Sequence, residues 1–235
     1  MIFSIKKSIA VLLLVLAASS VGYSQATYSV EFNATWSAET HPGEYPANAH
    51  FSPLVGTTHD SSVSLWEPGG FATNGIERMA ETGATLALRN EIRDAVGPDR
   101  AILGRAPGPD SPGFEALEFD VDADMSLITL VTMIAPSPDW FVGVSGFDLR
   151  PNDEWIDSVT IDLFGYDAGT DSGTDFTSVD WDTDPAAPIA PLTDAFVGTP
   201  ALGTFTFTLV SVPEPTSVTL LLAGLIGLLI HRRMR

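Results

Sequence analysis

The 235-residue chain contains no cysteine and only two lysines, Lys6 and Lys7. Without cysteine it can form no disulfide, so the fold must depend on its core, its hydrogen bonds or a bound metal. Residues 27–211 hold six arginines against 29 acidic residues, which gives a formal charge of −23. Such a surface repels nucleic acid and anionic lipid and attracts divalent cations, so we exclude a nucleic-acid-binding function.

The N-terminus has the three parts of a secretory signal peptide. Lys6 and Lys7 supply a basic start, residues 9–18 an apolar core, and Ser24-Gln25-Ala26 a small-x-small cleavage site. We therefore expect residues 1–26 to form a signal peptide that is cleaved after Ala26. The alternative is a membrane anchor, but the apolar run is much shorter than the ~20 residues that a spanning helix needs.

The C-terminal segment 212–235 combines a proline-rich motif, an apolar run and a basic end. Pro213-Glu214-Pro215 precede residues 216–230, and arginines follow at 232, 233 and 235. The apolar run is shorter than the ~20 residues of a full span, but bilayer thinning and snorkelling arginines compensate for such a difference. We expect a transmembrane helix over 216–230, with the arginines in the cytoplasm and the bulk of the chain outside it.

The order of these three parts resembles the PEP-CTERM sorting signal of Gram-negative bacteria. The resemblance implies that an exosortase recognises Pro213, Glu214 and Pro215 and cuts beside them. The protein would then be exported, first anchored in the inner membrane, and delivered to the cell surface or to exopolysaccharide. A simple C-terminal membrane anchor is the alternative.

The middle of the chain, residues 27–211, is long enough for one domain. Residues Tyr28–Trp36 alternate between apolar and polar side chains, as a strand does. Further strands are predicted over Phe114–Val121, Ser126–Ala135, Phe141–Phe147, Trp155–Tyr166 and Leu202–Val210. Clusters of Gly, Pro, Asp and Asn separate these strands, which favours an all-β fold, an antiparallel β-sandwich.

Two short helices are expected in the connections of this sandwich. Thr73-Asn74 can cap a helix over Gly75–Glu81 that ends at Gly83. A second helix over Leu86–Val96 has apolar residues at helical spacing and stops at Gly97-Pro98. Surface loops are expected over Gly104–Gly113 and Asp180–Pro191.

Two acidic segments beside predicted strands favour a site for a hard cation. Asp139 follows the stiff stretch Pro136-Ser137-Pro138, while Asp167 and Asp171 lie four residues apart in a loop with Gly169 and Gly173. Short Asp carboxylates and inward-turned carbonyls suit Ca²⁺, which takes six to eight oxygens; Mg²⁺ demands a stricter octahedron. The alternative is a turn with solvated acids.

His41, His50 and His59 recur nine residues apart, which raises the question of a zinc site. No cysteine accompanies them, and the spacing fits no zinc template, so structural histidines are favoured.

Several short motifs in residues 28–190 resemble, in one order, the spondin N-terminal domain. They are Thr35-Trp36-Ser37-Ala38-Glu39-Thr40-His41-Pro42, His50-Phe51-Ser52-Pro53-Leu54-Val55-Gly56, Leu65-Trp66, Met79-Ala80-Glu81, Pro136-Ser137-Pro138-Asp139-Trp140 and Asp167-Ala168-Gly169-Thr170-Asp171-Ser172-Gly173. The resemblance implies a secreted β-sandwich that binds calcium and takes part in adhesion. It places the family's calcium carboxylates on Asp139, Asp167 and Asp171. The animal members' cysteines have no counterpart here.

The sequence thus predicts a non-enzymatic, calcium-binding adhesion or matrix module. Its expected partners are the exosortase, the export machinery and exopolysaccharide or surface glycans. One alternative is an extracellular hydrolase for polysaccharide or ester that uses a carboxylate pair such as Glu39 and Asp139. The other is a passive structural matrix protein in which calcium serves only stability.

Overall fold

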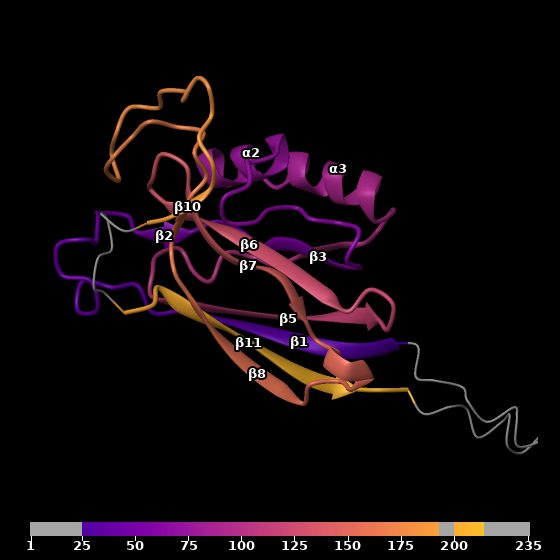
Figure 1. The fold of residues 1–235 in the computed structure, drawn as a ribbon. Helices are drawn as coiled ribbons and strands as arrows, with labels where there is room; N and C mark the ends of the chain where they lie inside the picture. The colour runs from indigo at the N-terminus through magenta and orange to yellow at the C-terminus, as the bar shows by residue number, and fades with distance from the viewer. Residues whose placement is uncertain (1–24, 193–199, 214–235) are drawn as a thin grey trace, which may run out of the picture.

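Two antiparallel sheets form the body of the computed structural model, which describes residues 25–192 and 200–213 (Figure 1). The first sheet has the order β5-β1-β11-β8 and the second the order β10-β9-β7-β6-β3-β4, with β2 paired to β6. The first comprises β5 (Gly113–Asp122), β1 (Gln25–Ala34), β11 (Gly203–Ser211) and β8 (Ser158–Leu163). The second comprises β10 (Ala190–Pro191), β9 (Tyr166–Asp167), β7 (Trp140–Asp148), β6 (Leu127–Ala135), β3 (Val55–His59), β4 (Ala101–Leu103) and β2 (His50–Phe51).

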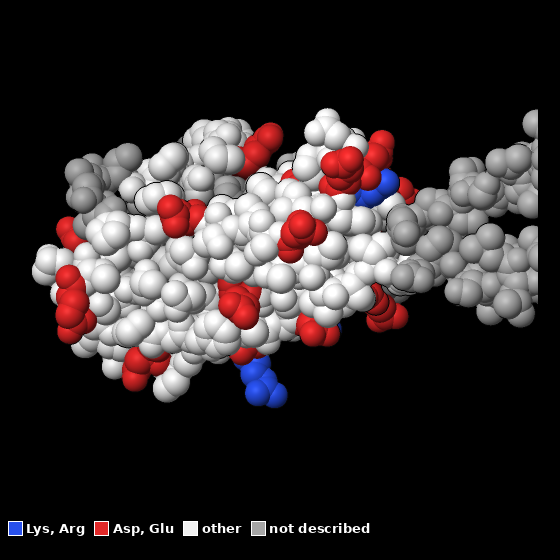
Figure 2. Space-filling model, turned by 90° about the horizontal axis from the view of Figure 1, so that it is seen from below, with Lys and Arg blue, Asp and Glu red and all other residues white. Residues whose placement is uncertain are grey.

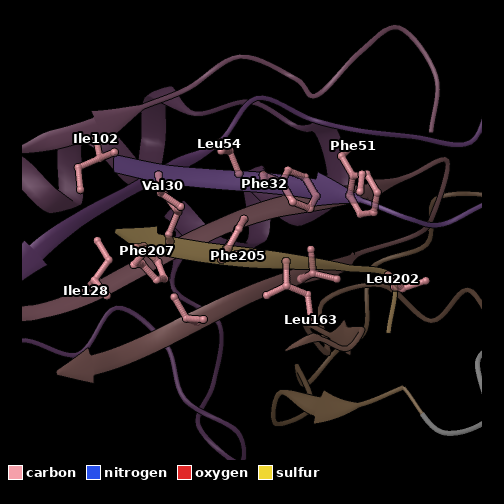
Figure 3. Close-up of a cluster of buried hydrophobic side chains, with 14 of the residues drawn as sticks. Val30, Phe32, Phe51, Leu54, Ile102, Ile128, Leu163, Leu202, Phe205 and Phe207 are labelled. Carbon is pink, nitrogen blue, oxygen red and sulfur yellow. The ribbon is translucent and has the colours of Figure 1, made fainter. Parts of the chain in front are cut away.

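The core between the sheets follows from period-two alternation. In β1 the side chains of Tyr28, Val30 and Phe32 are fully buried, while the residues between them face outward. Phe205 and Phe207 of β11 are buried beside them in the same way. All of these side chains pack against Leu54, which precedes β3, and against Ile128 and other side chains of the second sheet (Figure 3). The predicted antiparallel sandwich is therefore confirmed.

The second sheet is buried on both faces, because two helices cover its other side (Figure 1). They are α2 (Asn74–Thr82) and α3 (Leu86–Ala95), with the 3₁₀ turn η1 (Pro151–Asp153) elsewhere. Ile76 and Met79 of α2 pack with Val131 and Phe141 of the central strands. Consequently β6 is buried along nearly its whole length, which explains its almost uninterrupted apolar sequence.

Both ends of α2 match the sequence prediction. The Thr73 hydroxyl accepts a hydrogen bond from the Ile76 N–H at 3.2 Å, and Gly83 ends the helix with φ of 68°. An additional contact comes from α3, where the Glu91 carboxylate accepts from the Gly75 N–H and from the Thr73 hydroxyl, each at 2.7 Å. The two helices are thus joined by a partly buried polar contact as well as by their apolar faces.

The predicted strand over Trp155–Tyr166 is wrong in one respect: it is two strands in different sheets. β8 belongs to the first sheet and β9 to the second, and the chain crosses between them at Phe164-Gly165. A side chain on Gly165 would meet the end of the Leu192 side chain, so glycine leaves room for Leu192 at this crossing. Strand β3 was not predicted, since its sequence Val-Gly-Thr-Thr-His alternates poorly; Gly56 in it lies directly against the Thr129 carbonyl of β6.

The ends of the chain fall largely outside the described residues. Gln25 and Ala26, the last residues of the predicted signal peptide, lie in β1, where Ala26 is buried and pairs with Val121. Pro213 follows β11 and is exposed, whereas Glu214, Pro215 and the transmembrane helix predicted over 216–230 are outside the described part. Within residues 25–192 and 200–213 no helix is long and apolar enough to span a bilayer.

Candidate metal centre

Pairing between β7 and β9 brings the two acidic segments together. Trp140 faces Asp167 across this ladder, and the Ala168 N–H donates to the Asp139 carbonyl at 3.1 Å. On the other side of Asp139, the Ser137 hydroxyl accepts from the Trp140 N–H at 3.1 Å and fixes the turn that precedes β7. Residues 28 positions apart in the sequence therefore become neighbours through backbone hydrogen bonds alone.

Asp139 is fully buried, and its two carboxylate oxygens differ in their surroundings. Oδ2 accepts hydrogen bonds from the Thr170 N–H at 2.7 Å, the Asp171 N–H at 3.0 Å and the Thr170 hydroxyl at 3.2 Å. Oδ1 has no hydrogen-bond partner among the described residues. Buried polar atoms are nearly always satisfied by a protein group, a water or an ion, and Oδ1 has the lone pairs to accept one.

Electrostatics at Asp139 and Asp167 point the same way. Burial, reinforced by the charge of Asp167, raises the pKa of Asp139 to about 6, although three hydrogen bonds act against this. Burial also raises the pKa of Asp167; the Gly169 N–H, 2.7 Å from Oδ1, and the Trp140 side chain oppose the shift. A buried and a half-buried carboxylate are thus held close together, at a cost that a cation between them would reverse.

Asp171 is buried nearby, but its carboxylate is used differently. Oδ1 accepts from the Gly173 N–H and Oδ2 from the Trp181 N–H, both at 2.6 Å, so the side chain closes the loop that runs out to Trp181. In the part of the chain that the structure describes, no three His, Asp or Glu side chains are arranged to hold a metal ion. The three predicted residues nevertheless lie in one neighbourhood. Asp139 and Asp167 interact electrostatically, and the backbone N–H of Asp171 donates to the Asp139 carboxylate.

Glu81 at the end of α2 belongs to the same neighbourhood and was not predicted. Burial raises the pKa of Glu81, and the charges of Glu77, Asp180 and Asp139 add to this, whereas the Thr170 hydroxyl lowers it. The pKa of Asp180 is raised as well, first through its hydrogen bond with Asp171. No local signal identifies Glu81, because only the packing of α2 on the second sheet brings it to Thr170.

The three histidines occupy separate structural positions. His41 is buried, with Nε2 2.9 Å from the Pro200 carbonyl and Nδ1 2.8 Å from the Thr40 hydroxyl. His59 lies in β3 with Nε2 2.8 Å from the Thr129 hydroxyl, and His50 contacts the Asn48 carbonyl. Each ring is thus held by its own local contacts.

Comparison with known proteins supports the reading of the short motifs. The Spondin_N family profile matches residues 26–209. Human Spondin-2 is 35% identical over 201 residues, which cover 83% of this chain and 61% of that protein. Spondin-1 is 37% identical in human and 36% in Gallus gallus, each over 178 residues that cover 72% of this chain but 22% of the relative.

The chain therefore spans only part of the length of these relatives. Within this chain the family match takes in both helices, the acidic neighbourhood of Asp139 and both sheets, except for the first residue of β1 and the last two of β11. The chain belongs to the Spondin_N family.

Proposed function

We propose that the protein is an exported, calcium-binding adhesion or matrix module that acts at the cell surface or in exopolysaccharide. Its membership of the Spondin_N family supports an extracellular adhesion role. The acidic composition of residues 27–211 and the signal-like N-terminus agree with this location.

The observation that carries the calcium proposal is the orphaned Oδ1 of buried Asp139, next to the half-buried carboxylate of Asp167. Asp139 and Asp167 would hold the ion, together with Asp171, whose carboxylate keeps lone pairs beyond its two N–H contacts. Ca²⁺ also accepts backbone carbonyls and water, so a site with few carboxylates can still be filled. When bound, the ion would neutralise the negative charge of these poorly solvated carboxylates.

The test is thermal unfolding of the full-length chain in an uncharged detergent, with calcium or with EDTA. Calcium at about 100 times its Kd contributes ~2.7 kcal/mol, which raises Tm by about 5–10 °C for a domain of this size. Asp139→Asn and Asp167→Asn should abolish this shift. In EDTA, Asp139→Asn should melt at or above the wild type, since it removes the repulsion from Asp167.

The matched control is Asp162→Asn, which makes the same charge change on the exposed side of β8. It should retain the full calcium shift. Equal melting of the wild type in calcium and EDTA, or a shift that survives in Asp139→Asn, contradicts the proposal.

Catalysis is not part of the proposed function. Glycoside hydrolysis needs two carboxyl groups that both reach the substrate. Glu39 is exposed, but Asp139 is fully buried beneath the 170–171 backbone, so this pair cannot flank a glycosidic bond. We propose a binding or structural role instead.

We also propose that an exosortase sorts the protein through Pro213, Glu214 and Pro215. Strand β11 ends at Ser211, so the motif follows the folded domain at once, and Pro213 is exposed. Replacing Pro213 and Glu214 by alanine should leave folding unchanged but retain the protein in the inner-membrane fraction. Unaltered surface delivery of this variant, measured by cell fractionation, contradicts the sorting proposal.

A further inference from the structure

A surface pocket of about 340 Å³ lies between one side of α3, the turn that follows it and β4. Its lining includes Arg89, Arg93 and Arg100. These are three of only six arginines in residues 27–211, which contain no lysine. A domain of formal charge −23 therefore places half of its cations around one hollow.

The guanidinium of Arg89 is exposed and makes no ion pair or side-chain hydrogen bond with any described residue. Arg93 contacts Asp94 and donates through Nη1 to the side-chain Oδ1 of Asn90 at 3.1 Å, and Arg100 pairs with Asp122 at 2.6 Å. Arginine has five N–H donors, so both retain donors after these contacts. Arg89 contributes a free cation, while Arg93 and Arg100 are held in position.

This placement of arginines slightly destabilises α3. Arg89 and Arg93 are one turn apart on α3, where like charges repel each other weakly. No acidic side chain among the described residues forms an ion pair with Arg89, although acidic residues greatly outnumber basic ones. Sites where a chain departs from locally favourable charge placement are the ones at which to look for a ligand.

The rest of the lining fits a small solute that is polar on one side and apolar on another. Leu86 is 64% exposed and Leu103 45% exposed at the rim, and Asn90 offers an amide. Asp99 is the one carboxylate in the lining. The adjoining hollow shares Asp99 and Arg100 with this pocket but has Glu118 and Asp120 in place of Arg89 and Arg93, so charge directs an anion to the Arg89 side.

We propose that this pocket binds the carboxylate of an acidic sugar, as a free solute or as a residue of an acidic glycan. Arginine forks bind carboxylates through paired N–H donors, and the volume is within the range of small-ligand pockets. The assignment rests on the proposed matrix function, for which it names the chemistry of the glycan partner. It shares no residue with the Asp139 neighbourhood, so either proposal can fail alone.

The test is isothermal titration of the full-length chain, in an uncharged detergent, with sodium glucuronate, glucose and inorganic phosphate. Glucuronate should bind, glucose should not, and added NaCl should weaken the binding. Arg89→Gln should weaken glucuronate binding by about tenfold or more, since it removes a charge-assisted contact. Calcium should leave the glucuronate affinity unchanged.

The matched control is Arg105→Gln, because Arg105 is also exposed but lies outside the pocket lining. It should bind glucuronate as the wild type does. Equal weakening by Arg105→Gln and Arg89→Gln overturns the proposal, because the effect would then be one of overall charge. Equal binding of glucose, or phosphate binding as tight as that of glucuronate, overturns the assignment to an acidic sugar.

Discussion

At the scale of single residues, Tyr28 shows how one side chain on β1 fixes a distant segment. Its hydroxyl donates to the Ile156 carbonyl at 2.7 Å, with the Leu149 carbonyl at 3.2 Å, and its ring packs against Trp155. Burial, with the charge of Asp157 adding to it, raises the pKa of Tyr28 to about 12. The folded state therefore favours the protonated phenol.

This pKa predicts an alkaline loss of stability. The contribution of Tyr28 is complete below pH 10, the pKa of an unfolded tyrosine, and is lost as the pH rises through about 12. Urea unfolding at pH 8, 10 and 11.5 should show Tyr28→Phe destabilised by ~1 kcal/mol at pH 8, with this difference shrinking as the pH rises. A constant difference across the series contradicts the prediction.

The acidic residues show what single-residue patterns can and cannot predict. The turn-rich sequences around Asp139 and Asp167 indicated that both precede or end strands, and the β7–β9 pairing places them together. The contact of the Asp171 carboxylate with its own loop was not predictable, because it depends on Trp181, ten residues away. Glu81 reaches the Asp139 neighbourhood only because α2 packs on the second sheet, and no pattern in the nearby sequence indicates this.

At the scale of elements, the start of α2 is held from outside by α3. The Glu91 carboxylate receives both the Gly75 N–H and the Thr73 hydroxyl, and Gly75 has no room for a side chain against Glu91 and Leu88. Local capping by Thr73 was visible in the sequence, whereas the cap supplied by Glu91 requires the two helices to be packed. Helix limits were accordingly predicted well and the contact between the helices was not.

We predict that Thr73→Ala costs ~1 kcal/mol and Glu91→Ala ~1–3 kcal/mol of unfolding free energy, since each removes a partly buried hydrogen-bonding partner. Because Thr73 and Glu91 contact each other, the double variant should cost less than the sum by ~0.5 kcal/mol or more. Chemical denaturation of the four proteins measures this coupling. Strict additivity contradicts a shared cap.

At the scale of the whole molecule, acidic side chains are spread widely over the surface and basic ones are scarce, as Figure 2 shows for the side on which the four-stranded sheet lies. Residues 27–211 carry a formal charge of −23, so the folded domain repels itself. The charge and the layered all-β fold both followed from the sequence. The division of the strands between the two sheets did not, since Gly165 gives no sign of the sheet to which the next strand belongs.

Salt should therefore stabilise the protein when calcium is removed. In EDTA, Tm should rise as NaCl increases from 10 mM to 500 mM, because the Debye length falls from about 30 Å to below 10 Å and screens this repulsion. Thermal unfolding followed by circular dichroism checks the trend. A Tm that falls with added NaCl indicates that the ion pairs, such as Arg100 with Asp122, outweigh the repulsion.

The neighbouring positions of β1 and β11 have a mechanical consequence. Thr27 faces Ser211, so both ends of the described domain leave on the same side, while the 171–188 segment lies at the other end of the molecule (Figure 1). A pull between the C-terminal tail and that far end loads β11 lengthwise between β1 and β8. Hydrogen bonds across the strands then resist in shear and share the force, instead of opening one at a time.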